Sequence, residues 1–267
     1  MKQHLSTHYW AFWYALALLS RVPVPYLQRT DRDVAASSLL YYPIVGALLG
    51  LLLLGFTLLC SWWNPQLSLL LLAALLLLLW TGFTGALHLD GLADSADAWV
   101  GGLGDRERTL AIMKDPQSGP MGVTAVVLVL LLKLAAIFAL LEQARIDSGW
   151  SGWNIALLAA GLVLIPMLAR ASVLGLLATT PYVRSGGMAS DLVAGATPLR
   201  LVLWGLVLAA LALLLVPAQG LFLLALWLTL VLLLRQQLLK RLGGCTGDTL
   251  GAGIELQEAL LLAALAL

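Results

Sequence analysis

Residues 67–88 read LSLLLLAALLLLLWTGFTGALH, and residues 89–97 continue directly as LDGLADSAD. A helix of about 20 largely apolar residues is long enough to cross a lipid bilayer. Three aspartates follow this run with no linker between them and the apolar segment. The stretch therefore predicts a membrane-spanning helix that carries a group of carboxylates at its end.

The composition of the whole chain is that of a membrane protein. Its 267 residues are 61% hydrophobic and only 11% charged, with a formal net charge of +1, whereas soluble domains are about 45–50% apolar and about 25% charged. This excess excludes a soluble enzyme, a nucleic-acid binder and a disordered protein. The two cysteines, Cys60 and Cys245, predict neither a disulfide framework nor a metal site.

Six apolar stretches are long enough, or nearly long enough, to span the membrane: 39–60, 67–88, 119–141, 154–178, 199–217 and 220–234. Residues 9–20 and 254–267 are also apolar but short, and each could lie in the interface, re-enter or cross with tilt. We expect an all-α, polytopic integral membrane helix bundle with about six to seven transmembrane helices and short interfacial helices. Residues 1–267 are expected to form a single membrane-embedded catalytic domain.

The basic residues predict the orientation of the bundle. Loops 21–38, 89–118, 179–198 and 235–253 carry nearly all the loop lysines and arginines, while the opposite loops hold Arg145 alone. The positive-inside rule places the basic loops in the cytoplasm. All but two of the 14 carboxylates fall on the same side, so we expect the chemistry at the cytoplasmic face.

The aspartates after the second span have the spacing of a metal site. Asp90, Asp94 and Asp97 follow the i, i+4, i+7 pattern, which places them within an arc of roughly 60° on one helix face. Like charges so placed repel, and the next basic residue is Arg106. Oxygen ligands without cysteine or clustered histidine favour Mg²⁺; the alternative is a solvated acidic helix start. His88 could be an interfacial histidine, a metal neighbour or an acid/base group.

Two further polar segments fall on the same side. Residues 106–114 could form a short amphipathic surface helix that ends before Pro116 and presents Lys114 and Asp115 beside the aspartates; the alternative is an ordinary membrane-surface loop. Residues 242–253 are glycine-rich, so Thr246, Gly247 and Asp248 could bring backbone N–H groups close to phosphate oxygens.

Other charged residues are candidates for substrate contact. Arg170 lies inside a predicted span after Pro166, where it could contact phosphate or substrate or form a structural ion pair. Arg184 lies in a loop that could close over a ligand. Glu255 follows the glycine-rich segment, and Lys133 is expected to be structural or to snorkel.

Five pieces of the sequence together resemble the cobalamin synthase family. They stand in order along nearly the whole chain: 19–25 (LSRVPVP), 41–50 (YYPIVGALLG), 88–97 (HLDGLADSAD), 112–115 (IMKD) and 242–252 (LGGCTGDTLGA) with 254–256 (IEL). One departure is visible, because the family tends to continue Ser-Arg-x-Gly after the Lys-Asp pair, and here residues 116–119 read PQSG. A basic side chain is missing there, which puts a phosphate contact by that turn in doubt.

The resemblance implies a Mg²⁺-dependent enzyme of the bacterial cytoplasmic (inner) membrane. Such an enzyme would join adenosylcobinamide-GDP to α-ribazole, or to its 5′-phosphate, and release GMP. Asp90, Asp94 and Asp97 would hold one or two Mg²⁺ ions, Lys114 and Arg170 would offset charge in the transition state, and Asp94, Asp97 or Asp248 would accept the proton of the attacking ribose hydroxyl. No nucleic-acid partner is expected; homo-oligomers and association with other corrinoid enzymes stay open.

Two alternatives can be weighed from the residues. CDP-alcohol phosphotransferases also use membrane-face aspartates, but this chain has only the initial Asp90-Gly91 and lacks that family's later Ala-Arg, Gly and paired Asp. A cation transporter would require polar residues near the middle of the membrane on several spans. The polar residues of this sequence instead crowd one face.

Overall fold

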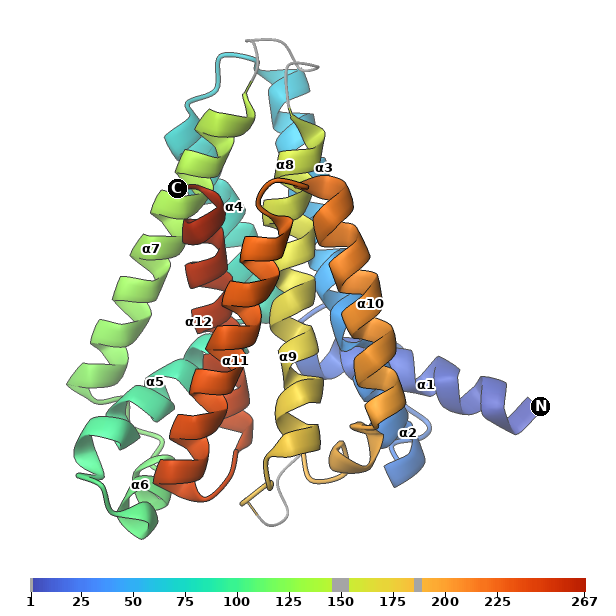
Figure 1. Ribbon diagram of the computed structural model, residues 1–267, viewed down its shortest axis with the longest axis vertical. Helices are drawn as coiled ribbons and strands as arrows, with labels where there is room; N and C mark the ends of the chain where they lie inside the picture. Colours follow the sequence, from blue (N-terminus) through green and yellow to red (C-terminus); the bar gives the residue numbers. More distant parts are fainter. Residues whose placement is uncertain (1, 146–153, 185–188) are drawn as a thin grey trace.

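The computed structural model describes residues 2–145, 154–184 and 189–267, and over these residues the chain is a bundle of helices without a strand. Most of the long helices run along the long axis of the molecule (Figure 1). This confirms the predicted all-α membrane bundle.

Five helical segments in the described residues are long and apolar enough to cross a membrane. They are the segment Arg32–Trp63, which contains α2 (Arg32–Ser38), η1 (Leu39–Tyr41) and α3 (Tyr42–Trp63); α7 (Pro120–Ala144); Ile155–Thr179, which contains α8 (Ile155–Ala159), the π-helical turn η2 (Ala160–Leu164) and α9 (Ile165–Thr179); α10 (Pro198–Leu215); and α11 (Gly220–Leu242). These segments correspond to five of the six predicted spans, although α11 continues well beyond residue 234.

The remaining predicted span, 67–88, is broken in the structure. Helix α4 (Leu69–Thr84) ends at Thr84, before the end of the predicted span. The next helix, α5 (Leu87–Gly101), lies at an angle of 86° to α4. Gly85 and Ala86 between them both have left-handed backbone angles, with φ of 60° and 58°. Helix α5 therefore turns away from the direction of the spanning helices and carries its aspartates along one end of the bundle.

Arg21 fixes this corner from a distant part of the sequence. Its backbone N–H donates a hydrogen bond to the carbonyl of Phe83 at 2.8 Å. Its side chain lies against Gly85, where a methyl group would collide with it. The left-handed conformation is easy for glycine but costs about 1 kcal/mol or more at Ala86. The contacts of Arg21 help to hold the bend in place.

The two short apolar stretches, residues 9–20 and 254–267, belong to helices that differ in position and burial. Helix α1 (Lys2–Leu19) does not meet the requirements for a spanning helix and lies across the long helices (Figure 1). The second stretch belongs to α12, which begins earlier than predicted and covers Gly247–Leu265. Most side chains of α12 are buried, and it packs against α5, α7, α9 and α11. Helix α12 is therefore a central element of the bundle.

The remaining short elements are α6 (Arg106–Ile112), which matches the predicted surface helix, and η3 (Val193–Gly195). Gly46 and Gly50 of α3 lie directly on the carbonyls of Pro166 and Leu162. The i, i+4 spacing of these two glycines therefore lets α3 pack closely against another helical segment of the same chain. The π-helical turn η2 precedes Pro166, whose ring cannot continue regular helical hydrogen bonding.

Candidate active site

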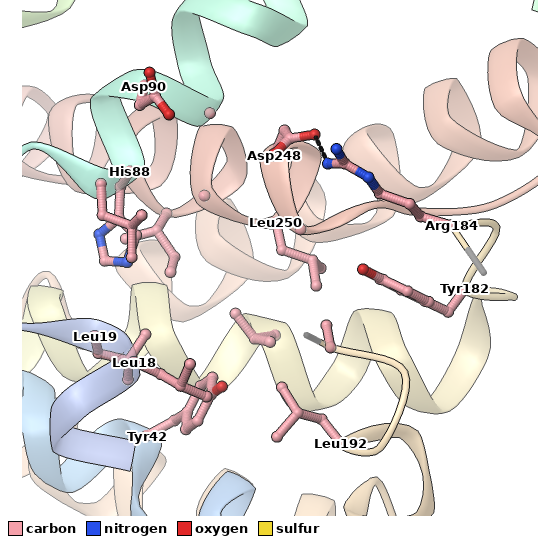
Figure 2. Close-up of a pocket in the computed structure, with 17 residues that line it drawn as sticks. Leu18, Leu19, Tyr42, His88, Asp90, Tyr182, Arg184, Leu192, Asp248 and Leu250 are labelled. Carbon is pink, nitrogen blue, oxygen red and sulfur yellow. Dashed lines mark hydrogen bonds and ion pairs between the residues drawn. The ribbon is translucent and has the colours of Figure 1, made fainter. Parts of the chain in front are cut away.

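The three aspartates of α5 lie at one end of the bundle, close to the start of α12. Asp90 is exposed, and Asp94 and Asp97 are half-buried. The first turn of α12 adds a fourth carboxylate, Asp248, so the structure brings together two motifs that are about 150 residues apart in the sequence. Figure 2 shows Asp90 and Asp248 on the same side of a cavity.

Glycines allow these two helices to touch through their backbones. A methyl group at Gly91 would lie 2.7 Å from the carbonyl oxygen of Asp248, and one at Gly251 would lie 3.3 Å from the Cα atom of His88. In each motif, a glycine therefore lies in contact with the backbone of the other motif. This contact sets the distance between the aspartates of α5 and Asp248.

A reciprocal cap starts α12 and holds Asp248 in its first turn. The Thr246 hydroxyl accepts the backbone N–H of Thr249 at 3.2 Å, and the Thr246 backbone N–H donates to the Thr249 hydroxyl at 2.9 Å. Thr246 is almost fully buried. These polar groups of Thr246, which sequence analysis assigned to substrate, therefore serve to begin the helix. Gly247 is exposed and lines the cavity.

Arg184 is the cation closest to the carboxylate of Asp248. Its guanidinium donates to Asp248 at 2.9 Å (Figure 2). The segment before it is tied to the chain ahead of α12, because the Cys245 N–H donates to the Pro181 carbonyl and the Val183 N–H donates to the Cys245 carbonyl. The structure thus places Arg184 beside Asp248.

The carboxylates at this end of the bundle act on one another. Burial and the charges of Asp90, Asp248 and Asp97 together raise the pKa of Asp94 to about 6, against the opposing effect of Arg184. Burial also raises the pKa of Asp248, partly offset by Arg184. The site therefore holds more negative charge than its own cations neutralise.

Asp97 has a structural contact that sequence analysis missed. Its two carboxylate oxygens accept the backbone N–H groups of Gly119 and Gly122 at 2.6 and 2.9 Å. Asp97 thereby caps the start of α7, where the free N–H groups favour a negative charge. The signal in the sequence is the pair of glycines around Pro120, which leaves room for the carboxylate.

Two cavities meet at the Arg184–Asp248 pair. The larger, of about 390 Å³, is lined by His88 and Asp90 as well as by this pair. The smaller, of about 140 Å³, is lined by Lys114 and Thr246 together with the same pair. Lys114 therefore lies on the wall of the smaller cavity. Asp115 lines neither cavity; it is exposed and accepts the backbone N–H of Gln117.

Arg170 and Glu255 lie away from both cavities, in a buried network of charges. Glu258 accepts hydrogen bonds from Lys133 at 2.6 Å, from Arg170 at 2.6 Å and from the Trp80 indole at 3.1 Å. Glu255 accepts a second bond from Lys133 at 2.5 Å. The structure favours the ion-pair alternative for Arg170, and it places Glu255 among protein partners.

His88 points away from the aspartates of its own helix. Its Nδ1 atom is 4.0 Å from Glu255 Oε1, its ring forms part of the wall of the larger cavity, and neither ring nitrogen has a hydrogen-bond partner in the described part of the chain. This position separates His88 from the carboxylate cluster.

The carboxylates of α5 have the donor chemistry of a hard-cation site. Among the described residues, no three His, Cys, Asp or Glu side chains are already arranged around a common point. Asp90 and Asp94 nevertheless extend from adjacent turns of one helix, and their oxygens are the ligand type that Mg²⁺ prefers when substrate phosphates and water complete its shell. The residues present therefore fit a Mg²⁺ ion bound together with a phosphorylated substrate.

Fold and site together define a polytopic α-helical membrane protein with an acidic, phosphate-compatible site at one end of its bundle. The model of the cobalamin-5-phosphate synthase family matches residues 11–266. The chain belongs to this family.

Curated relatives cover nearly the same length. The chain is 50% identical over 258 residues to the adenosylcobinamide-GDP ribazoletransferase of Pseudomonas entomophila, with 96% of this chain and 98% of the relative covered. It is 48% identical over 260 residues to the protein of the same name from Pseudomonas syringae, with the same coverage, and 49% identical to that of Ectopseudomonas mendocina, with 95% and 97% covered. No solved structure matches the chain.

Proposed function

We propose that this protein joins adenosylcobinamide-GDP to α-ribazole, or to its 5′-phosphate, and releases GMP. The ribose hydroxyl oxygen forms a bond to the phosphorus attached to the cobinamide, and the P–O bond to the GMP phosphate breaks. GMP leaves with the electron pair, and the hydroxyl proton passes to a carboxylate of the protein. The observation that carries the proposal is the meeting of the two family motifs, through Gly91 and Asp248, at a site with both carboxylates and cations.

The proposed cofactor is Mg²⁺, held by Asp90, Asp94 and Asp97. When bound, it neutralises charge on the diphosphate and on the departing GMP. Asp97 is held in place by the two N–H groups at the start of α7. Burial, together with the charges of the neighbouring carboxylates, raises the pKa of Asp94, and this supports the need for a cation here.

The side chains around the two cavities have distinct proposed roles. Lys114 and Arg184, which both line the smaller cavity, bind and orient the diphosphate. Asp248 lines both cavities, so it is the carboxylate best placed to take the proton as the two substrates meet. Its burial raises its pKa, which brings it closer to the range useful for a general base.

The proposed location is the bacterial inner membrane, with the site facing the cytoplasm. The spanning helices support a multi-pass protein. The excess of lysine and arginine in the loops that flank the site supports the orientation.

The test is turnover by the purified, membrane-reconstituted protein with adenosylcobinamide-GDP, α-ribazole and Mg²⁺, followed by GMP release and by the joined corrinoid. We expect Asp94→Asn to lower turnover by about 10²-fold or more, and removal of Mg²⁺ to abolish it. Asp33→Asn, which changes an exposed aspartate on α2, is the matched control. Full activity of Asp94→Asn with an unchanged Mg²⁺ requirement would refute the ligand set. Absence of turnover by folded wild type would refute the reaction.

A further inference from the structure

The two cavities at the site differ in character, although they share Arg184 and Asp248. The smaller cavity has a second cation, Lys114, on its wall. The larger cavity extends from the shared pair into the bundle, between α1, α3, α5, α9 and α12. The Arg184–Asp248 ion pair thus lies where the smaller, polar cavity meets the larger cavity.

The walls of the larger cavity are mainly apolar. Those walls are formed chiefly by Leu18, Leu19, Tyr42, Val173, Leu192 and Ile254. The charged groups are confined to one edge, where Figure 2 shows Asp90, Asp248 and Arg184 with Leu250 below them. The cavity is therefore suited to a molecule with an apolar body and a polar end.

We propose that the larger cavity receives the benzimidazole base of α-ribazole, with the ribose directed to the edge that carries Asp248. This inference rests on the proposed function, and it assigns the second substrate to a space of its own. The dimethylated benzimidazole ring is flat, aromatic and almost entirely apolar, whereas its ribose carries the hydroxyl groups.

Size and polarity separate this substrate from the other one. The volume of about 390 Å³ is in the lower part of the range of small-molecule sites, roughly 300–1,000 Å³, and a corrinoid ring with its side chains exceeds it. Guanine fits the walls less well, because most of the lining is apolar and would leave several of its amide and amino groups without hydrogen-bond partners. The diphosphate needs cations, and the smaller cavity has two, Lys114 and Arg184, whereas the larger has Arg184 alone.

The assignment also explains why the cavities join at the Arg184–Asp248 pair. With the base in the larger cavity and the diphosphate in the smaller, the ribose hydroxyl and the phosphorus approach each other beside Asp248. The carboxylate is then within reach of the hydroxyl proton at the moment the new P–O bond forms.

Val173→Phe tests the assignment, because it fills part of the cavity from α9. In the reconstituted full chain we expect the KM for α-ribazole to rise about tenfold or more, while the KM for adenosylcobinamide-GDP stays within about twofold. For benzimidazole riboside, which lacks the two methyl groups, Val173→Phe should raise the KM less than it does for α-ribazole. Leu176→Phe is the matched control, since it enlarges a buried residue of the same helix that does not line the cavity.

The assignment is wrong if Val173→Phe raises the KM for adenosylcobinamide-GDP instead, leaves both KM values unchanged, or has the same effect as Leu176→Phe. Calorimetric titration of α-ribazole separates this proposal from the proposed reaction. Binding to wild type that is lost in Val173→Phe supports the cavity even if no turnover occurs, and no binding to wild type overturns it. If Val173→Phe does not fold, Val173→Ala should admit a bulkier naphthimidazole riboside with a lower KM than wild type shows.

Discussion

Glu258 is the residue whose loss should most weaken the bundle. It is fully buried in α12 and accepts hydrogen bonds from Lys133 of α7, Arg170 of α9 and Trp80 of α4. Glu258→Gln removes one of two carboxylates that balance two cations, and its new amide N–H group is placed among donors. Breaking a buried ion pair by removing one partner costs about 3–5 kcal/mol.

The expected effect is a large fall in thermal stability. For chains of roughly this size, about 1 kcal/mol corresponds to about 2–4 °C in Tm, so Glu258→Gln should lower Tm by roughly 6–20 °C. The change can be followed by intrinsic tryptophan fluorescence during heating in detergent. Glu142→Gln, which makes the same chemical change at an exposed position, should stay within about 0.5 kcal/mol of wild type.

A double variant tests whether the cause is charge balance. Lys133→Met combined with Glu258→Gln leaves Arg170 and Glu255, one cation and one carboxylate. We expect the double variant to lose about 1–3 kcal/mol less unfolding free energy than the sum of the losses in the two single variants. Strict additivity, or a fall of less than about 3 °C for Glu258→Gln alone, would refute the network as a source of stability.

Three further predictions concern the site. Gly91→Ala should lower turnover by about 10²-fold, because the methyl group displaces α12 at Asp248; Gly55→Ala, which has open space around it, should leave steady-state turnover unchanged. Asp97→Ala should reduce stability by about 1–2 kcal/mol through loss of the α7 cap, seen as a lower Tm that Asp97→Asn partly restores. Chelation with EDTA should abolish GMP release yet shift Tm by less than about 2 °C, because the proposed ligands lie at one end of the bundle, where Asp90 is exposed and Asp94 and Asp97 are half-buried.

The spanning helices could be predicted from the sequence because the length of an apolar run is a local property. The bend after α4 could not, because Gly85 and Ala86 lie within a mainly apolar stretch that continues to Leu89. The cause of the bend is partly long-range, since Arg21 contacts the corner from a segment more than 60 residues earlier.

The candidate site was predictable to the extent that its residues lie within short motifs. The spacing of the α5 aspartates and the Thr-Gly-Asp segment both pointed to it, and the structure brings them together. The partners of buried charges were not predictable in this way. Lys133 and Arg170 could be recognised as costly inside a membrane, but their carboxylates lie 88 to 125 residues away on α12, in a stretch that looked too short to span.

The arrangement of charge in the two regions argues for the proposed cation. Inside the bundle, two carboxylates face two cations, and the charges balance. At the site, the four carboxylates Asp90, Asp94, Asp97 and Asp248 face only Lys114 and Arg184 among the cavity-lining cations of the described chain. A diphosphate brought to such a site adds further negative charge, and repulsion would oppose its binding. The one or two divalent cations that we propose would restore the balance, and they would make the acidic end of the bundle suited to an anionic substrate.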